Sequence, residues 1–364
     1  ELPFVGSERG DSGDPNFGYV FGTQYDSSSE VVPSTLKTVK ITDETSIANC
    51  AFQGCSNITK IGLSGNVNVI GHQAFSGCTS LTEIDVSGNV KSIGYQAFSG
   101  CTSLTNVLLP NSLVGISEKA FENCFSLATF NMPASVVNIG AQIFAGCVNL
   151  TAVFVVGTGG AYSSVDGVLY SADQNELVCV PLAKTLFEVP ATVKKIRAYA
   201  FANLTKLEDV VIPDGVEEIG ADAFYGCTAL VNIEFPNSLV SIGSEALKGC
   251  RSLKRVVLPF IGSNRGCSGS SKFAYIFGSN FAPTSLEEVI VTDDDAITDE
   301  AFSGCTKLKN VFIGSSVTNI GSKAFCDCRL IECLSLPFIG ANENAANSYL
   351  GYFFDGSSSK NRYV

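Results

Sequence analysis

The chain has few of the residues that binding to nucleic acid or to a membrane surface requires. Its 364 residues carry 23 Lys and Arg against 35 Asp and Glu, for a formal net charge of −12. Nucleic acid and anionic lipid both attract basic residues, so this balance argues against either partner. The longest apolar runs, such as residues 153–156, are far too short to cross a bilayer. The sequence therefore predicts no nucleic-acid binding and no membrane insertion by this chain.

The sequence also lacks residues that could act together in catalysis or hold a cofactor. Hydrolases and transferases need acid, base or nucleophilic groups that converge on a substrate. The single histidine, His72, has no Ser or Asp motif around it, which favours an exposed polar residue. The run Asp293-Asp294-Asp295 lacks the spaced ligands of a calcium loop, which favours a solvated loop. We therefore predict a protein that is not an enzyme and has no catalytic, cofactor-binding or metal-binding residues.

What the chain has instead is a repeat built on Ala-Phe-x-Gly-Cys, with a step of 23 residues. The apolar fraction of 45% and the charged fraction of 16% are typical of a folded chain. A unit this short cannot bury a core alone, so the period predicts stacked copies that share one continuous core. The aromatic position of the repeat holds Phe52, Phe75, Phe98, Phe121, Phe144, Phe201, Phe224, Leu247, Phe302 and Phe325.

One copy of the repeat shows the elements that we expect in all of them. Residues 83–86 alternate Glu and Asp with Ile and Val, which is typical of a half-buried strand. In several other copies a Pro follows this strand and ends its hydrogen-bond ladder. A second short extended piece carries Val90 and Ile93. Gly94 then allows a turn, and residues 95–99 are too few for more than one helical turn.

The residue two places after the Phe predicts the backbone conformation of that turn. Gly, Asn and Asp enter the left-handed region at the lowest cost, and they alone occupy this position. We therefore expect every copy to end its turn in the left-handed conformation, with the Phe closing the convex side of the core. The ten residues are Gly54, Gly77, Gly100, Asn123, Gly146, Asn203, Gly226, Gly249, Gly304 and Asp327.

The next position is Cys in nine of the ten copies and Leu204 in the other. A position that accepts Cys or Leu indicates a small apolar core site. Neighbouring parallel strands lie about 4.8 Å apart. Equivalent Cys residues of successive copies are then somewhat too far apart for relaxed disulfide geometry, so we predict buried free thiols. Metal binding is disfavoured because paired Cys-x-x-Cys spacing is absent. We call the nine cysteines at this repeat position the ladder cysteines. The off-ladder cysteines Cys50, Cys179, Cys267 and Cys333 lie at other positions, and whether they form disulfides stays open.

Two interruptions of the period divide the chain. The first contains apolar runs at 165–170 and 177–181 around a polar stretch, which predicts a β-hairpin. The second matches segments at both ends of the chain, so we expect a fragment of a longer parent that starts and ends inside a super-repeat. We predict a single solenoid over 1–364, made of a partial insert (1–32), repeats (33–157), a hairpin insert (158–182), repeats (183–257), an aromatic insert (258–282), repeats (283–335) and a partial insert (336–364).

The aromatic inserts pair a Leu-Pro-Phe-(Val/Ile)-Gly stretch with a later aromatic run. The first copy begins at Leu2, the second at Leu258 and the third at Leu336. Their three copies could present Tyr to a partner, because Tyr is enriched at interfaces. We favour the alternative that the alternating aromatics pin each insert onto the solenoid, because sustained exposure would invite aggregation. The three tyrosines are Tyr19, Tyr275 and Tyr352.

The succession of a strand with Pro and then Ile-Gly-x-x-Ala-Phe-x-Gly-Cys-x-x-Leu resembles the BspA-like leucine-rich repeats, also called the Treponema pallidum type. The resemblance covers nearly the whole chain, including the hairpin residues 166–170 and the Leu-Pro-Phe-Ile-Gly segments. It implies an α/β repeat solenoid, a right-handed superhelix with a parallel β-sheet on the concave face, short helical turns on the convex side, and hairpin or loop inserts. It brings no catalytic residues.

The resemblance also implies an extracellular or cell-surface protein of a host-associated bacterium or parasitic protist. Such proteins act in adhesion, so the expected partner is a host matrix or cell-surface protein, or a surface glycan. The alternative is a structural spacer that projects another domain from the cell surface.

The outward residues of the strands are the candidate contact surface, because solenoids commonly bind there. The competing interpretation is a solvated sheet with scattered apolar residues. The alternation also places Thr38, Lys40, Ala152, Val257 and Ile290 on this face. The main candidates are Glu83, Asp85, Asn106, Leu108, Thr129, Asn131, Phe154, Asp209, Val211, Asn232, Glu234, Arg255, Glu288, Asn310 and Phe312.

Overall fold

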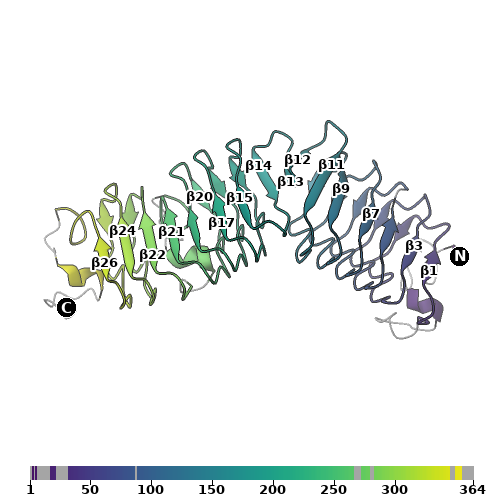
Figure 1. Cartoon of the computed structure of the whole chain (residues 1–364), viewed down its shortest axis with the longest axis horizontal. Coiled ribbons are helices and arrows are strands. Elements are labelled where there is room, and N and C mark those ends of the chain that lie inside the picture. Colours follow the sequence, from purple (N-terminus) through teal and green to yellow (C-terminus); the bar gives the residue numbers. More distant parts are fainter. Residues whose placement is uncertain are drawn as a thin grey trace. The chain divides into compact units, whose positions relative to one another are not determined.

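The computed structural model divides into two compact units, each a stack of short coils. Unit 1 is Glu1–Gln174 with Val178–Ala183, and unit 2 is Asn175–Leu177 with Lys184–Val364. The described residues are 2, 3, 5, 17–21, 32–86, 88–265, 272–278, 283–344 and 349–354, with the side chain of Tyr19 excepted. Within each unit, strands from successive coils lie side by side in rows (Figure 1).

The first row of unit 1 consists of parallel strands, one from each coil, in two sheets. Strands β1 (Thr38–Lys40), β3 (Lys60–Gly62), β5 (Glu83–Asp85) and β7 (Asn106–Leu108) form a four-stranded sheet, and β9 (Thr129–Pro133) pairs with β11 (Ala152–Val156). The register pairs residues one repeat apart, for example Ile61 with Ile84. The middle residue of each strand is buried and its neighbours face outward, which confirms the predicted alternation.

A second row of two-residue strands runs along unit 1. It consists of β2 (Ser46–Ile47), β4 (Val69–Ile70), β6 (Ser92–Ile93), β8 (Gly115–Ile116) and β10 (Asn138–Ile139), all parallel. In four of these strands the Ile is buried, and Ile139 of β10 is partly buried. The core of the unit therefore lies among the two rows and the turn that carries the repeat Phe.

Unit 2 repeats this arrangement. Its first row contains the pair β15 (Leu186–Glu188) and β17 (Asp209–Val211) and the five-stranded sheet β19 (Asn232–Glu234), β21 (Arg255–Leu258), β22 (Glu288–Val291), β24 (Asn310–Ile313) and β26 (Cys333–Ser335). Its second row contains β16 (Lys195–Ile196), β18 (Glu218–Ile219) and β20 (Ser241–Ile242), with Glu176 and Leu177 of β14 (Glu176–Cys179) paired to β16. Strands β23 (Ala296–Ile297) and β25 (Asn319–Ile320) form a further parallel pair.

The hairpin segment contains the two expected strands, as β13 (Val168–Ser171) and β14. It also contains β12 (Tyr162–Val165), which pairs with β13 in antiparallel fashion. The two-residue turn between β12 and β13 is Asp166-Gly167, with φ of 50° and 77°. Positive φ at both positions defines a type I′ turn, whose twist matches that of the flanking strands.

The expectation of helical turns on the convex side is wrong. The described residues contain no α-helix, so the fold is all-β rather than α/β. The residue two places after the Phe is left-handed in every copy, from 57° at Asn123 to 81° at Gly304, as predicted. The residue two places before the Phe is left-handed as well, from 51° at Gln96 to 61° at Tyr199. Left-handed residues at both ends of this five-residue stretch prevent the run of right-handed residues that a helix needs.

The turn residues direct their N–H groups along the stack instead. Gln73, Phe75 and Gly77 donate to carbonyls of the next coil at 2.8, 2.8 and 2.7 Å. The same three bonds recur between other neighbouring copies. A non-glycine residue in the left-handed region costs about 1 kcal/mol or more. A typical hydrogen bond returns about 1 kcal/mol net, so the three bonds of each turn offset that cost.

The repeat Phe residues form a stacked column in the core. All ten residues of the position, including Leu247, are at most 4% exposed. In unit 1 the ring centroids of Phe75 and Phe98, and of Phe98 and Phe121, lie 5.2 Å apart. Their planes differ by 11° and 3°. Near-parallel rings at this distance contribute beyond their buried area, which confirms the predicted aromatic edge of the core.

The ladder cysteines are free and buried, as predicted, but they are more than small apolar fillers. The thiol of Cys78 donates to the carbonyl oxygen of Phe52 at 3.1 Å, and that of Cys101 donates to Phe75 at 3.2 Å. Five further ladder cysteines, in both units, donate in the same way to the carbonyl oxygen of the Phe one copy before.

The off-ladder cysteines are also free where they are described. Cys50 and Cys179 are half-buried and Cys333 is exposed. Cys267 lies outside the described residues. These positions therefore carry no disulfide in the described part of the chain.

The aromatic inserts join the Phe column through short 3-10 helices, namely η1 (Phe17–Phe21), η2 (Phe273–Phe277) and η3 (Leu350–Phe353). Phe273 is fully buried, with its ring centroid 5.2 Å from that of Phe302. Phe17 lies 4.9 Å from Phe52 in the same way. The expectation that aromatics anchor these segments is confirmed, although they join the main core. Tyr275 and Tyr352 are half-buried.

A buried carboxylate holds the start of two inserts. Glu44 and Asp294 are 2% and 1% exposed. Glu44 accepts the backbone N–H of Val5 at 3.1 Å, and Asp294 accepts that of Ile261 at 2.8 Å. The middle residue of the Asp293-Asp294-Asp295 run is therefore a structural acceptor and not part of a solvated loop.

We predict that Gly94→Ala lowers the free energy of unfolding by about 2–3 kcal/mol, since overpacking a tight contact typically costs that much. A Cβ at Gly94 would lie 2.7 Å from backbone atoms of Gly71 and His72 in the preceding coil. Gly65→Ala is the control, because a Cβ there meets nothing within 4 Å. Urea denaturation of both variants checks this. Equal stability of the two would contradict close coil contact as the reason for the Ile-Gly motif.

The buried thiols predict a loss of stability at high pH. Burial raises the pKa of Cys101 and of Cys250 from the 9.0 of an ordinary thiol to about 12. The folded state holds these protons more tightly, so their contribution is complete below about pH 9 and disappears as the pH rises towards 12. At pH 10 each thiol should remove about 1.4 kcal/mol. Denaturation at pH 8 and pH 10 measures this, and Cys101→Val with Cys250→Val should flatten the dependence.

Thiol alkylation at pH 8 gives a separate check. In the native protein the nine ladder thiols should remain unmodified, since each is at most 5% exposed. In urea all 14 cysteines should react. Modification of a ladder thiol in the folded protein would show that the coils open readily.

Candidate binding surface

The strand face is the set of outward residues on the first-row strands, and all fifteen candidates lie on it. Most are exposed, whereas the last four are half-buried. Val257 is a correction, because it is only 4% exposed. It pairs in register with Glu234 and Ile290 on the flanking strands, and Arg255 reaches past it to Glu234. The exposed candidates are Glu83, Asp85, Asn106, Leu108, Thr129, Asn131, Phe154, Asp209, Val211, Asn232 and Glu234, and the half-buried ones are Arg255, Glu288, Asn310 and Phe312.

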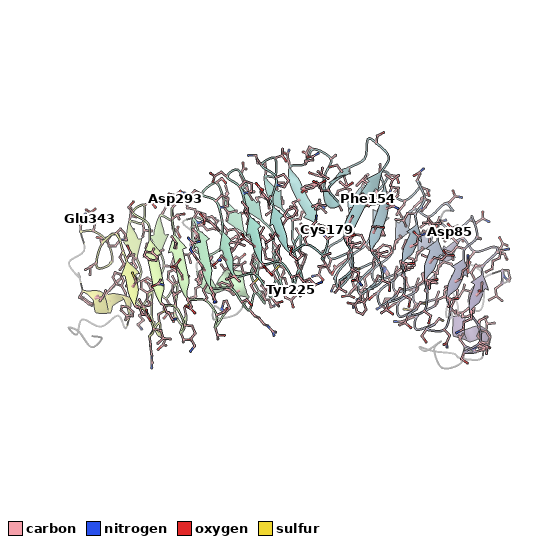
Figure 2. All side chains as sticks on the ribbon, in the orientation of Figure 1. Asp85, Phe154, Cys179, Tyr225, Asp293 and Glu343 are labelled. Carbon is pink, nitrogen blue, oxygen red and sulfur yellow. The ribbon has the colours of Figure 1, made fainter. Side chains whose placement is uncertain are left out.

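The strand face of unit 1 carries both charged and exposed apolar side chains, among them Asp85 on β5 and Phe154 on β11 (Figure 2). On β3 and β5, Lys60 and Glu83 form an ion pair at 2.9 Å. The hydrogen bond that Lys60 donates to the Glu83 carboxylate raises the pKa of Lys60 above its ordinary 10.5. Further along, Leu108, Phe154 and Val156 are 50%, 44% and 54% exposed. Apolar groups gathered on one surface favour contact with a partner.

The strand face of unit 2 combines acidic and apolar residues. Leu186 and Val211 are 64% and 52% exposed, and the register places Leu186 beside Asp209 and Val211 beside Glu188. The basic residue of this region is Arg255 on β21. Its guanidinium lies 2.8 Å from Glu288 and 3.6 Å from Glu234.

A shallow hollow of about 530 Å³ lies in this region of unit 2, over β17 and β19. Five of the fifteen candidates line it, together with the exposed carboxylate of Asp214 and the apolar residues Ile212 and Pro236. The structure therefore gathers part of the predicted surface into one concave site. The five candidates are Asp209, Val211, Asn232, Glu234 and Arg255.

The hollow coincides with a break in the strand ladder. Among the described strands, β17 pairs with β15, whereas β19 begins the separate five-stranded sheet. The carboxylate of Asp209 accepts the backbone N–H of Val210 at 2.9 Å. Asp side chains compete with the ladder for backbone groups in this way. Val210 is the middle residue of β17, so its N–H is engaged by the Asp209 side chain at the place where the pairing with β19 is missing.

Some residues of this surface escaped the sequence prediction. Leu186 and Glu188 show the same alternation as the candidates and could have been named from it. Asp214 follows Pro213, beyond the strand, and no periodic signal marks it. The break at Asp209 depends on a side-chain orientation that the repeat pattern does not encode.

His72 is exposed, as predicted, but it also stabilises the backbone. Its Nδ1 accepts the N–H of Tyr95 at 2.9 Å, and its own N–H donates to the Asn49 side chain at 2.7 Å. Within the described ranges, no group of three or more His, Cys, Asp or Glu could hold a metal ion. No helix among the described residues is long and apolar enough to span a bilayer.

The coils, the parallel strand rows and the open strand face define a leucine-rich-repeat solenoid. The chain belongs to the BspA type of leucine-rich-repeat proteins. Residues 33–151, 182–294 and 274–353, well over half of the chain, match the family described as the BspA type leucine rich repeat region. The family assignment expected from the Ala-Phe-x-Gly-Cys pattern is therefore confirmed.

Solved structures of bacterial leucine-rich-repeat proteins share this fold. A leucine-rich repeat protein from Bacteroides ovatus is 27% identical, with a TM-score of 0.58 over 83% of this chain and 76% of that chain. A leucine rich cell surface protein from Faecalibacterium prausnitzii is 29% identical, with a TM-score of 0.51 over 82% and 79%. A leucine-rich repeat protein from Eubacterium ventriosum is 23% identical, with a TM-score of 0.61 over 90% of this chain and 92% of that chain. No match was found among the curated proteins.

We predict that Asp209→Val allows the Val210 N–H to pair with β19 and raises the free energy of unfolding by about 0.5–1 kcal/mol, the range of β-propensity effects. Asp209→Asn is the control, since its amide oxygen can still accept the Val210 N–H. Amide hydrogen exchange at Val210 and urea denaturation measure both effects. Equal protection of Val210 in the two variants would rule out Asp209 as the cause of the break.

Proposed function

We propose that this protein is a non-catalytic interaction module at the cell surface or in the extracellular medium. In this proposal it attaches to host matrix, host cells or other microbes. The observation that carries the proposal is the strand face, which extends along each unit and keeps large apolar side chains exposed among charged ones. Leu108, Phe154 and Val156 in unit 1 illustrate this, each at least 44% exposed.

Two further points support the proposal. The Faecalibacterium prausnitzii relative is described as a cell surface protein. The face also provides what protein recognition needs, because apolar groups supply contact energy and charged neighbours supply specificity. A host matrix or cell-surface protein suits this mixture of groups, and a surface glycan is the second candidate ligand.

The alternative function is a spacer that projects another domain from the cell surface. A unit built of stacked coils around its own core suits such a role equally well. The two proposals differ in what they require of the strand face, since a spacer needs no exposed apolar side chains there.

The test is binding of the intact, folded chain to a panel of purified extracellular-matrix proteins and to epithelial cell monolayers. We expect saturable binding to at least one of them. Phe154→Ser should weaken that binding about tenfold, because truncating a central aromatic typically costs more than 1 kcal/mol. Val148→Ser is the matched control, since Val148 is 52% exposed but lies in a turn outside the strand face.

The result decides between the two functions. Binding that Phe154→Ser weakens and Val148→Ser leaves unchanged supports recognition by the strand face. Absence of binding to every probe by a folded chain, verified by its thermal transition, would favour the spacer.

A further inference from the structure

The hollow of unit 2 differs from the rest of the strand face in its charge balance. In unit 1, Lys60 compensates Glu83 within the sheet at 2.9 Å. Around the hollow, Arg255 is the basic residue of the lining, and it is already engaged by Glu288 and Glu234 at 2.8 and 3.6 Å. The carboxylates of Asp209 and Asp214 line the same hollow. The hollow therefore carries excess negative charge towards solvent.

The hollow also has an apolar side. Val211 lines it and is 52% exposed, with Ile212 and Pro236 beneath. Leu186, 64% exposed, lies beside Asp209 in the register of β15 and β17. Glu188 lies beside Val211 in the same register, so acidic and apolar groups alternate in both directions across the two strands. A surface of this kind suits side chains with an apolar stem and a cationic end.

The site lies where the ladder of paired strands is interrupted. Here the Asp209 carboxylate holds the Val210 N–H at 2.9 Å, and the two strands belong to separate sheets. The hollow of about 530 Å³ lies over this break, which distinguishes it from a patch of acidic side chains on a flat surface.

We propose that this part of the strand face docks an extended basic segment of a partner protein, in which Lys or Arg alternates with apolar residues. The inference rests on the proposed function and specifies the chemistry of its partner. The cationic end of one side chain contacts Asp214 and Glu234, and its methylene stem packs on Val211, as long basic side chains do on apolar surfaces. The next apolar residue of the segment contacts Leu186.

The test uses a labelled, end-capped nonapeptide of alternating Lys and Val, with an alternating Glu and Val peptide as the matched probe. Fluorescence anisotropy with the whole chain measures both affinities at 50 and 300 mM NaCl. We expect the Lys peptide to bind and the Glu peptide not to bind. Higher salt should weaken binding of the Lys peptide, because exposed ion pairs are screened.

Two double variants test the location of the site. Asp214→Asn with Glu234→Gln should weaken the Lys peptide about fivefold, as the loss of two exposed ion pairs predicts. Glu217→Gln with Glu218→Gln removes the same charge from the start of β18 and the residue before it, in the second row, and should change the affinity less than twofold. Val211→Ser should weaken binding about threefold at both salt concentrations, because it removes an apolar contact.

The outcomes separate this inference from the proposed function. No binding of the Lys peptide, or equal weakening by both double variants, overturns the basic-segment proposal. The matrix and cell assay above can succeed in that case, and recognition would then use another part of the strand face. Selective weakening by Asp214→Asn with Glu234→Gln supports the inference whatever the outcome of that assay.

Discussion

The interaction on which the structure depends is the hydrogen bonding of each coil to the next. A single coil of 23 residues contains two short strands and a turn, and only part of its backbone groups find partners within the coil itself, such as the N–H of Ser76 with Gln73. The strand rows satisfy some of them, and the turn satisfies others by donating from Gln73, Phe75 and Gly77 to the next coil at 2.7–2.8 Å. The two strand rows and the turn therefore hold successive coils at one spacing, and the side chains at equivalent positions must stack.

This constraint explains the residues that recur. The Phe rings stack because the backbone sets them about 5 Å apart, close to the spacing of parallel strands. The Cys is retained because its thiol donates to the Phe carbonyl of the preceding coil, a bond that Leu cannot make. Six of the ten copies have Gly after the Ile. Two coils approach at that corner, and a Cβ at Gly94 would lie 2.7 Å from the preceding backbone. Each motif residue thus serves contact between coils.

The outward strand residues are released from that constraint, so the chain can vary them from coil to coil. Unit 1 has a compensated ion pair on β3 and β5 and exposed Leu, Phe and Val further along the face. Unit 2 has excess carboxylates and a hollow where Asp209 interrupts the ladder. A repetitive core therefore carries a non-repetitive surface, which is the arrangement that specific recognition by a solenoid requires.

The sequence by itself determined the coil period, the buried faces, the left-handed position after the Phe, the free thiols and the family. The structural features recur in ten or nearly ten copies of the repeat, so a residue preference that is weak in one copy becomes decisive when all copies are compared. Only the tertiary structure decided that the turn is not helical, because the left-handed residue two places before the Phe can be Gln, Lys, Tyr, Glu, Asp or Cys and bonds to the neighbouring coil. It also decided that Val257 is buried and that a hollow lies beside Asp209. Both depend on the arrangement of single side chains, for which no periodic signal exists.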